Sequence, residues 1–246
     1  MAIDCIFTTY LTKRLGFSQH DSSHNGKGKS QPDDYKLMKG WYESLLKLCS
    51  KSDNMKGVIF HNECSQSFID KYSNEYISFV KWEKQHRPSY NDERFWAFRE
   101  FLTKRDDVQR AFSTDMFDVK FFRNPFEIMD KESKYHLYVG SEVGKKCGRK
   151  WVNKKMRWFK FPQISNDETV YNAGICGGVR KNLLKFYEVM ISYFQKISTK
   201  HNANMAVYNQ SLRDIKKRKW KIYTGFPLHN QFQSNKVPEG TYIKHK

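Results

Sequence analysis

The sequence predicts an α/β protein, a single domain built on a mixed, mainly parallel sheet with helices on both faces. Short apolar, β-branched runs alternate along the chain with longer segments whose apolar residues recur at helical spacing. This alternation is typical of parallel strands joined by crossover helices. Apolar residues make up 39% and aromatic residues 16% of the 246, which is enough for a substantial core. We expect one domain over 1–246, with mobile loops at 18–34 and 145–168.

The first half of the chain is expected to begin with a buried strand at 3–9, followed by the polar loop. A helix follows, because apolar residues recur at helical spacing: Leu37, Trp41, Leu45 and Leu48. Asp33 or Asp34 can cap this helix. The remaining expected elements of this half are a strand at 57–60, a helix around 68–72, a strand at 76–80 and a helix at 91–104.

The second half continues the alternation. Strands are expected at 108–112, 118–122 and 135–140. The clearest helix runs over 180–198, and another helix is expected near 203–213 before a strand at 220–224. No internal repeat or linker divides the chain, which supports a single domain.

Composition and the N-terminal sequence exclude several classes of protein. No apolar run approaches the roughly 20 residues that a membrane-spanning helix needs. Asp4 stands where a signal peptide would carry a basic region. The five cysteines are scattered and form no Cys-x-x-Cys pair, which argues against a zinc cluster and a disulfide scaffold. We expect a soluble protein of a reducing compartment, the cytoplasm.

The net charge of +18 favours anionic partners. Residues 145–160 hold eight basic residues and two tryptophans with no acid, and 216–219 form a second basic run. Basic residues interleaved with aromatics can bind nucleic acid. The same pattern is typical of a solvated loop on a lysine-rich protein, and we favour that interpretation because no recognised nucleic-acid module is present.

Two acids lie between neighbouring expected strands. Asp115 and Asp118 follow the strand at 108–112 and adjoin the strand at 118–122. Ligands bind beyond the carboxyl ends of strands in open α/β sheets. Carboxylates placed there suit Mg²⁺ or Mn²⁺, which can bridge a diphosphate. The alternative is that either aspartate only caps a turn.

Two later segments could take part in a binding site, and each also has an ordinary structural interpretation. Residues 170–178 contain three glycines and Asn172, so the backbone can approach a ligand closely, or the segment is a bulged strand. His229 lies in a proline-containing loop, where a neutral imidazole can complete a metal site or serve as an ordinary histidine. Neither a dinucleotide-binding glycine motif nor a P-loop is present.

The order of these segments resembles that of GT-A glycosyltransferases. The series runs from Thr8-Thr9-Tyr10, through Asp115-Met116-Phe117-Asp118-Val119 and Tyr171 to Gly178, to His229-Asn230-Gln231-Phe232. It is most similar to the small soluble virus-encoded enzymes, such as those of chloroviruses that glycosylate capsid protein, and it covers roughly 3–232. The resemblance implies a single domain that binds a nucleotide-diphosphate sugar.

The resemblance also implies roles for individual residues. Asp118 and His229 would bind Mn²⁺ (or Mg²⁺), and Asp115 would contact the metal or the nucleotide ribose. The acids here read Asp-x-x-Asp, where the family usually has Asp-x-Asp. The donor-binding residues would be Thr8, Thr9 and Tyr10 at the nucleobase, Arg94 and Arg99 at the diphosphate or sugar, and Asn172, Ala173 and Gly174 at the donor sugar or acceptor.

The expected activity is therefore hexosyl or pentosyl transfer from a UDP-sugar to a glycan or glycoprotein acceptor, with inversion. The catalytic base would be Glu142, or Asp167 or Glu168; Asn204 stands where many relatives have an aspartate. In this interpretation 145–160 is a mobile loop that closes on donor or acceptor, and Trp151 and Trp158 stack on sugars or anchor the loop. The alternative function is a basic nucleic-acid-binding protein or metal-dependent nuclease, which leaves the glycine-rich and histidine segments unexplained.

Overall fold

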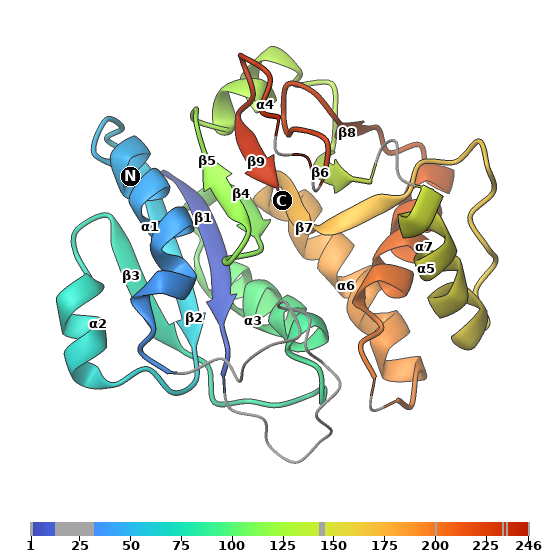
Figure 1. Ribbon diagram of the computed structural model, residues 1–246, viewed down its shortest axis with the longest axis horizontal. Coiled ribbons are helices and arrows are strands. Elements are labelled where there is room, and N and C mark those ends of the chain that lie inside the picture. Colours follow the sequence, from blue (N-terminus) through green and yellow to red (C-terminus); the bar gives the residue numbers. More distant parts are fainter. Residues whose placement is uncertain are drawn as a thin grey trace.

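A computed structural model describes residues 2–12, 32–142, 146–199, 201–232, 234 and 236–245. Its centre is a seven-stranded sheet of order β3-β2-β1-β4-β7-β6-β8 (Figure 1). The strands are β1 (Ile3–Tyr10), β2 (Met55–His61), β3 (Ile77–Lys81), β4 (Val108–Thr114), β6 (Leu137–Ser141), β7 (Tyr171–Val179) and β8 (Ile222–Thr224). β7 runs antiparallel to β4 and β6, and the other pairings are parallel. The predicted α/β class with a mostly parallel mixed sheet is confirmed.

Helices cover both faces of this sheet, as predicted. They are α1 (Tyr35–Cys49), α2 (Gln66–Tyr72), α3 (Tyr90–Lys104), α4 (Phe126–Lys131), α5 (Lys146–Trp158), α6 (Arg180–Lys196) and α7 (Asn204–Lys217). Alternate residues of β1 face opposite ways: Cys5 and Phe7 pack with α3, α6 and α7, whereas Ile6 packs with α1. Burial of these two apolar clusters is the main contribution to the stability of the sheet and of the helices packed on it.

The described residues include no helix with both the length and the apolar character that crossing a membrane requires.

A second, small sheet joins two segments far apart in the sequence. β5 (Val119–Phe121) pairs antiparallel with β9 (Ile243–His245), with Val119 opposite His245. Backbone bonds extend this contact, since Ile243 N donates to Leu228 O at 2.9 Å. The C-terminal strand therefore lies directly beside the segment that follows Asp118.

Helix α1 begins where the sequence allows a cap. Asp34 is the N-cap residue, and its carboxylate accepts from the backbone N–H of Lys36 at 3.0 Å. Trp41 on the inner face is fully buried and donates from Nε1 to Thr114 Oγ1 at 2.8 Å. This bond ties α1 to the last residue of β4, immediately before Asp115.

The structure differs from the sequence prediction at 145–168, which was expected to be a mobile loop. Residues Lys146–Trp158 form α5, because Val152 and Met156 lie one helical turn apart and are both fully buried. This short apolar face is hard to recognise in the sequence, because basic residues surround it. Of the other expected loop, 18–34, residues 18–31 lie outside the described residues, and 32–34 lead into α1.

The strand order creates a switch point between β1 and β4. From β1 the chain proceeds outward to β2 and β3 and then returns to β4 on the other side of β1. At this point Thr8 donates from Oγ1 to Thr114 O at 2.8 Å. A crevice outside the carboxyl ends of the strands at such a point is the general ligand position in open α/β sheets.

Candidate functional site

Three side chains capable of ligating a metal meet beyond the carboxyl end of β4. Asp115, Asp118 and His245 each offer one ligand atom, and these atoms lie within 4.8 Å of one another. His245 Nε2 is 3.7 Å from Asp115 Oδ2 and 3.9 Å from Asp118 Oδ1. The structure thus brings the two predicted aspartates together with a histidine that sequence reasoning did not single out.

Backbone contacts position Asp115 and His245 in the cluster. Asp115 N donates to Gly174 O at 2.9 Å, which joins the end of β4 to β7. His245 is placed by the pairing of β9 with β5, and its N–H donates to Asn230 Oδ1 at 2.7 Å. The cluster is therefore assembled by two sheets rather than by one loop.

Gly174 is the residue that leaves room for the cluster. A Cβ atom at this position would overlap the His245 ring and the Asp115 carboxylate. Glycine alone lets β7 pass this closely. The glycine-rich segment is thus a strand, as one of the two sequence interpretations held, and its glycine also shapes the site.

The charges around the cluster are uneven. Arg94, in the second turn of α3, forms an ion pair with Asp115 through Nη1 and donates from Nη2 to Ala173 O at 3.0 Å. Burial, and next the negative charge of Asp115, raise the pKa of Asp118 to about 6, although His245 and Arg94 oppose this rise. A bound cation would favour the ionised form of Asp118.

The donor atoms of the cluster fit a divalent cation. Asp118 Oδ1 and both ring nitrogens of His245 are buried and have no hydrogen-bond partner within the described part of the chain. Leaving buried polar atoms unpaired is costly, and such atoms call for an unseen partner. Carboxylate oxygens suit Mg²⁺ and Mn²⁺, and a neutral imidazole is a common ligand of transition metals.

His229 is not in this cluster, contrary to the expectation that it would join the two aspartates. Its Nε2 accepts from the backbone N–H groups of Ser141 at 3.2 Å and Gly225 at 3.1 Å. Its Nδ1 donates to Asn230 O at 2.7 Å. Burial lowers the pKa of His229 to about 4, so the ring is neutral and joins the ends of β6 and β8. Of the two histidines, His245 is the one that lies beside Asp115 and Asp118.

The residues expected at the nucleobase lie at the carboxyl end of β1. Thr8 and Tyr10 are fully buried, and the Tyr10 hydroxyl accepts from Asp34 N at 3.0 Å. Thr9, which alternates with them, is half-buried. Of the two expected arginines, Arg94 reaches the cluster, whereas Arg99 forms an exposed ion pair with Glu188 at 3.6 Å on α6.

Glu142 is linked to the cluster through the glycine-rich strand. Asn172 donates from Nδ2 to Glu142 Oε1 at 3.1 Å and accepts from Gly174 N at 2.8 Å. Asn172, Ala173 and Gly174 therefore form a short path between Glu142 and the cluster of Asp115, Asp118 and His245.

The other carboxylates named as base lie in a different environment. Asp167 sits in an exposed turn, where hydrogen bonding from Ser165 lowers its pKa. Glu168 is paired with Arg213 at 2.6 Å, and this pairing lowers its pKa to about 2. Both carboxylates form hydrogen bonds or ion pairs that stabilise the turn before β7.

Sequence reasoning missed His245 because the strand that carries it has only three residues. A run of this length shows no usable periodicity. The nearest signal is the apolar pair Tyr242 and Ile243 near the end of a polar segment, and both are buried.

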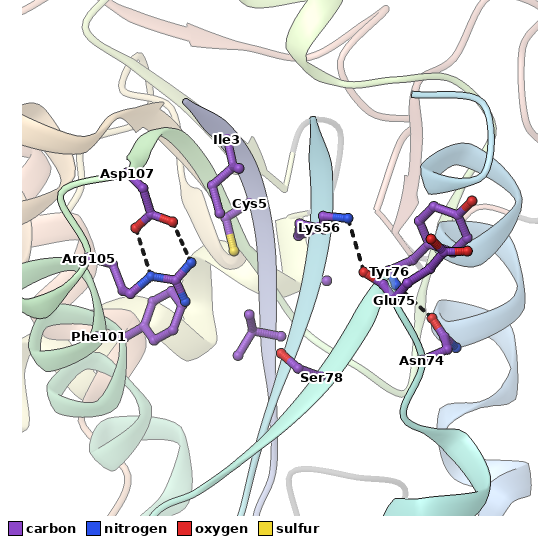
Figure 2. Close-up of a pocket in the computed structure, with 12 residues that line it drawn as sticks. Ile3, Cys5, Lys56, Asn74, Glu75, Tyr76, Ser78, Phe101, Arg105 and Asp107 are labelled. Atoms are coloured by element: carbon purple, nitrogen blue, oxygen red, sulfur yellow. Dashed lines mark hydrogen bonds and ion pairs between the residues drawn. The ribbon is translucent and has the colours of Figure 1, made fainter. Parts of the chain in front are cut away.

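A cavity of about 250 Å³ lies at the opposite edge of the sheet, around the amino ends of β1, β2 and β3 (Figure 2). The ion pair between Arg105 and Asp107 borders one side of it, and Lys56 donates to the backbone of Glu75 on the other side. This cavity is separate from the Asp115, Asp118 and His245 cluster, because the cluster lies at the carboxyl ends of the strands.

Neither a scan against protein-family models nor a search of curated proteins finds a match to this chain. The function is therefore inferred from the geometry of the cluster and its place in the sheet.

Proposed function

We propose that this protein is a metal-dependent glycosyltransferase, which moves a sugar from a nucleotide-diphosphate donor to a hydroxyl of a glycan or glycoprotein, with inversion. We take the donor to be a UDP-sugar. The observation that carries the proposal is the cluster of Asp115, Asp118 and His245 beside the β1–β4 switch point. The order of motifs along the chain, which resembles that of GT-A enzymes, supports the same function.

The cluster suits a diphosphate ligand. Asp115, Asp118 and His245 would hold Mn²⁺ or Mg²⁺, and the bound cation would neutralise charge on the departing diphosphate. Arg94 would add a positive charge fixed by its bonds to Asp115 and Ala173. Thr9, which is half-buried at the end of β1, would border the nucleobase, with the buried Tyr10 beneath it.

Glu142 is the carboxylate that we assign as general base. It follows β6 at the same edge of the sheet, and Asn172 orients one of its oxygens. In this role it would take the proton of the acceptor hydroxyl as that hydroxyl attacks the anomeric carbon. Asp167 is disfavoured because it lies in an exposed turn beside Ser165.

Calorimetric titration with UDP and GDP, each with and without Mn²⁺, tests the proposal. Wild-type protein is expected to bind UDP only when Mn²⁺ is present. Asp118→Asn and His245→Gln should each weaken Mn²⁺ binding by more than about a hundredfold, because removing a direct ligand costs more than removing an outer partner. Circular dichroism establishes whether each variant is folded.

Asp53→Asn is the matched control, since Asp53 is an exposed aspartate before β2. It should bind metal and nucleotide as the wild type does. Unchanged Mn²⁺-dependent nucleotide binding by a folded Asp118→Asn protein would refute the assignment. If no nucleotide binds in the presence of Mn²⁺, the donor site is wrong, and metal-dependent cleavage of nucleic acid becomes the function to test.

A further inference from the structure

Helix α5 carries two of the largest exposed apolar side chains of the described residues. Trp151 is 46% and Trp158 is 52% exposed. The helix itself is firmly placed, because Val152 and Met156 are fully buried in the core shared with α6 and α7. Figure 1 shows α5 at the periphery of the molecule, beside α7. Exposed apolar side chains that lie together mark an interaction surface more often than single scattered ones do.

Trp151, Lys155 and Trp158 form one ridge along the helix, with the lysine between the two indole rings. Lys155 Nζ lies 5.9 Å from the ring centroid of Trp151 and 5.1 Å from that of Trp158. The three residues follow the spacing i, i+4, i+7, so they share one side of the helix. Cation–π contacts of this kind hold the two rings in line along the helix.

Positive charge flanks this ridge. Lys150, Lys154 and Arg157 are exposed on α5, and no acidic residue occurs from 146 to 166. Asn153 pins the following segment by exchanging two hydrogen bonds with the backbone of Ile164, at 2.9 Å and 2.7 Å. The outer face of α5 is therefore basic, aromatic and held in position.

We propose that this α5 face, made of Lys150, Trp151, Lys154, Lys155, Arg157 and Trp158, docks on the surface of an anionic lipid bilayer. Lysine and arginine complement anionic headgroups, and each one near the surface contributes to binding. Tryptophan prefers the boundary between headgroups and acyl chains. The combination on a single helix face matches a surface that offers negative charge above an apolar layer.

Single-stranded nucleic acid is the competing partner, and the geometry favours it less. Proteins that bind single strands combine a basic groove with aromatic stacking platforms. The outer face of a helix is convex. Lys155 lies over one face of each indole ring, and the Trp158 ring also contacts the His201 ring, with 4.7 Å between centroids. A convex ridge fits a flat, deformable lipid surface better than it fits a strand.

The docked face adjoins the candidate site. The Glu142 carboxylate packs so closely on Gly148, in the first turn of α5, that a Cβ atom there would overlap it. Docking would thus hold the carboxyl edge of the sheet near the lipid. The proposal does not depend on the transferase assignment, because it concerns only the outer face of α5.

Co-sedimentation of the full chain with vesicles tests the proposal. The probes are phosphatidylcholine vesicles and phosphatidylcholine vesicles that also contain phosphatidylserine. Wild-type protein should bind only the anionic vesicles. Lys150→Glu with Lys154→Glu should weaken binding by about thirtyfold or more, since one basic residue near an anionic surface contributes about fivefold. Trp151→Ala with Trp158→Ala should weaken it by at least about tenfold.

Two control variants separate the α5 face from general properties of the protein. Lys36→Glu with Lys47→Glu makes the same change in net charge at exposed positions of α1. Phe122→Ala with Phe226→Ala removes two other exposed aromatics, which are 52% and 58% exposed. Both controls should bind anionic vesicles as the wild type does. Thermal unfolding followed by circular dichroism shows that all variants are folded.

Three results would overturn the proposal. Equal weakening in the α1 control would mean that the net charge alone attracts the vesicles. Undiminished binding by the folded tryptophan variant would mean that the ridge does not enter the lipid. Failure to bind anionic vesicles, together with salt-sensitive binding of a single-stranded oligonucleotide through the same lysines, would assign the face to nucleic acid.

Discussion

His229 and His245 lie near the same edge of the sheet and are both almost completely buried, at 2% and 1% exposed. Their partners make them different. The ring nitrogens of His229 are hydrogen-bonded to backbone groups of Ser141, Gly225 and Asn230, whereas the ring nitrogens of His245 have no hydrogen-bond partner in the described chain. A histidine whose nitrogens are already bonded stabilises loops, and one with unpaired nitrogens beside two carboxylates suits a metal.

The stability of the protein should therefore depend on the protonation of His229. Its pKa is about 4 in the folded state against an ordinary value of 6.5, so between these values the unfolded chain binds more protons. The stabilising contribution is complete above about pH 6.5 and is lost as the pH falls through 4. From pH 7 to 4 the loss should approach about 3 kcal/mol. Urea unfolding across this range measures it.

His229→Gln is the comparison for this pH effect. The variant should be less stable at pH 7, but its free energy of unfolding should fall less steeply than that of the wild type between pH 6.5 and 4. Asp118, whose raised pKa gives the opposite slope, is present in both proteins and cancels in the difference. Parallel pH profiles for the two proteins would show that His229 is not held neutral.

At the scale of elements, the three-residue strand β9 matters more to the site than its length suggests. It carries His245, and its Ile243 is fully buried between β5 and the segment around Leu228. Ile243→Ala should lower the free energy of unfolding by about 2–4 kcal/mol through the cavity it leaves. It should also weaken Mn²⁺ binding, because the strand that places His245 loses its anchor.

Ile77→Ala in β3 provides the control for the β9 variant. Ile77 is also fully buried, but it lies on the far side of β2 and β1 from the cluster. Ile77→Ala should lower the free energy of unfolding by a similar amount. Its Mn²⁺ affinity, measured by calorimetry under folding conditions, should stay at the wild-type value. Equal weakening of Mn²⁺ binding by both variants would mean that β9 has no special role in the site.

At the scale of the whole molecule, the 18 excess positive charges repel one another in the compact state. Salt screens this repulsion, since the Debye length falls from about 30 Å at 0.01 M to about 10 Å at 0.1 M. Surface ion pairs lose little in the same range because each contributes at most about 1 kcal/mol. The unfolding temperature should therefore rise when sodium chloride is raised over this range.

Lys36→Glu with Lys47→Glu lowers the net charge and should reduce this dependence on salt. Scanning calorimetry of both proteins at the two salt concentrations measures the change. A wild-type unfolding temperature that falls with salt would show that local ion pairs outweigh the net repulsion.

The sequence by itself determined the α/β class, most helices and strands, and the pair Asp115 and Asp118, because each of these depends on local spacing of residue types. It also predicted the helix that carries Arg94 and the strand that ends just before Glu142. It did not reveal that 146–158 is helical, since the apolar face of α5 consists of little more than Val152 and Met156 among many charges.

Only the tertiary structure decided which histidine joins the aspartates. His229 and His245 both follow short apolar segments, and no local pattern separates them. The pairing of β5 with β9 and the bonds from Ser141 and Gly225 are contacts between segments distant in the chain. Local sequence encodes secondary structure through periodicity, whereas the composition of a site depends on which distant strand ends the packed sheet brings together.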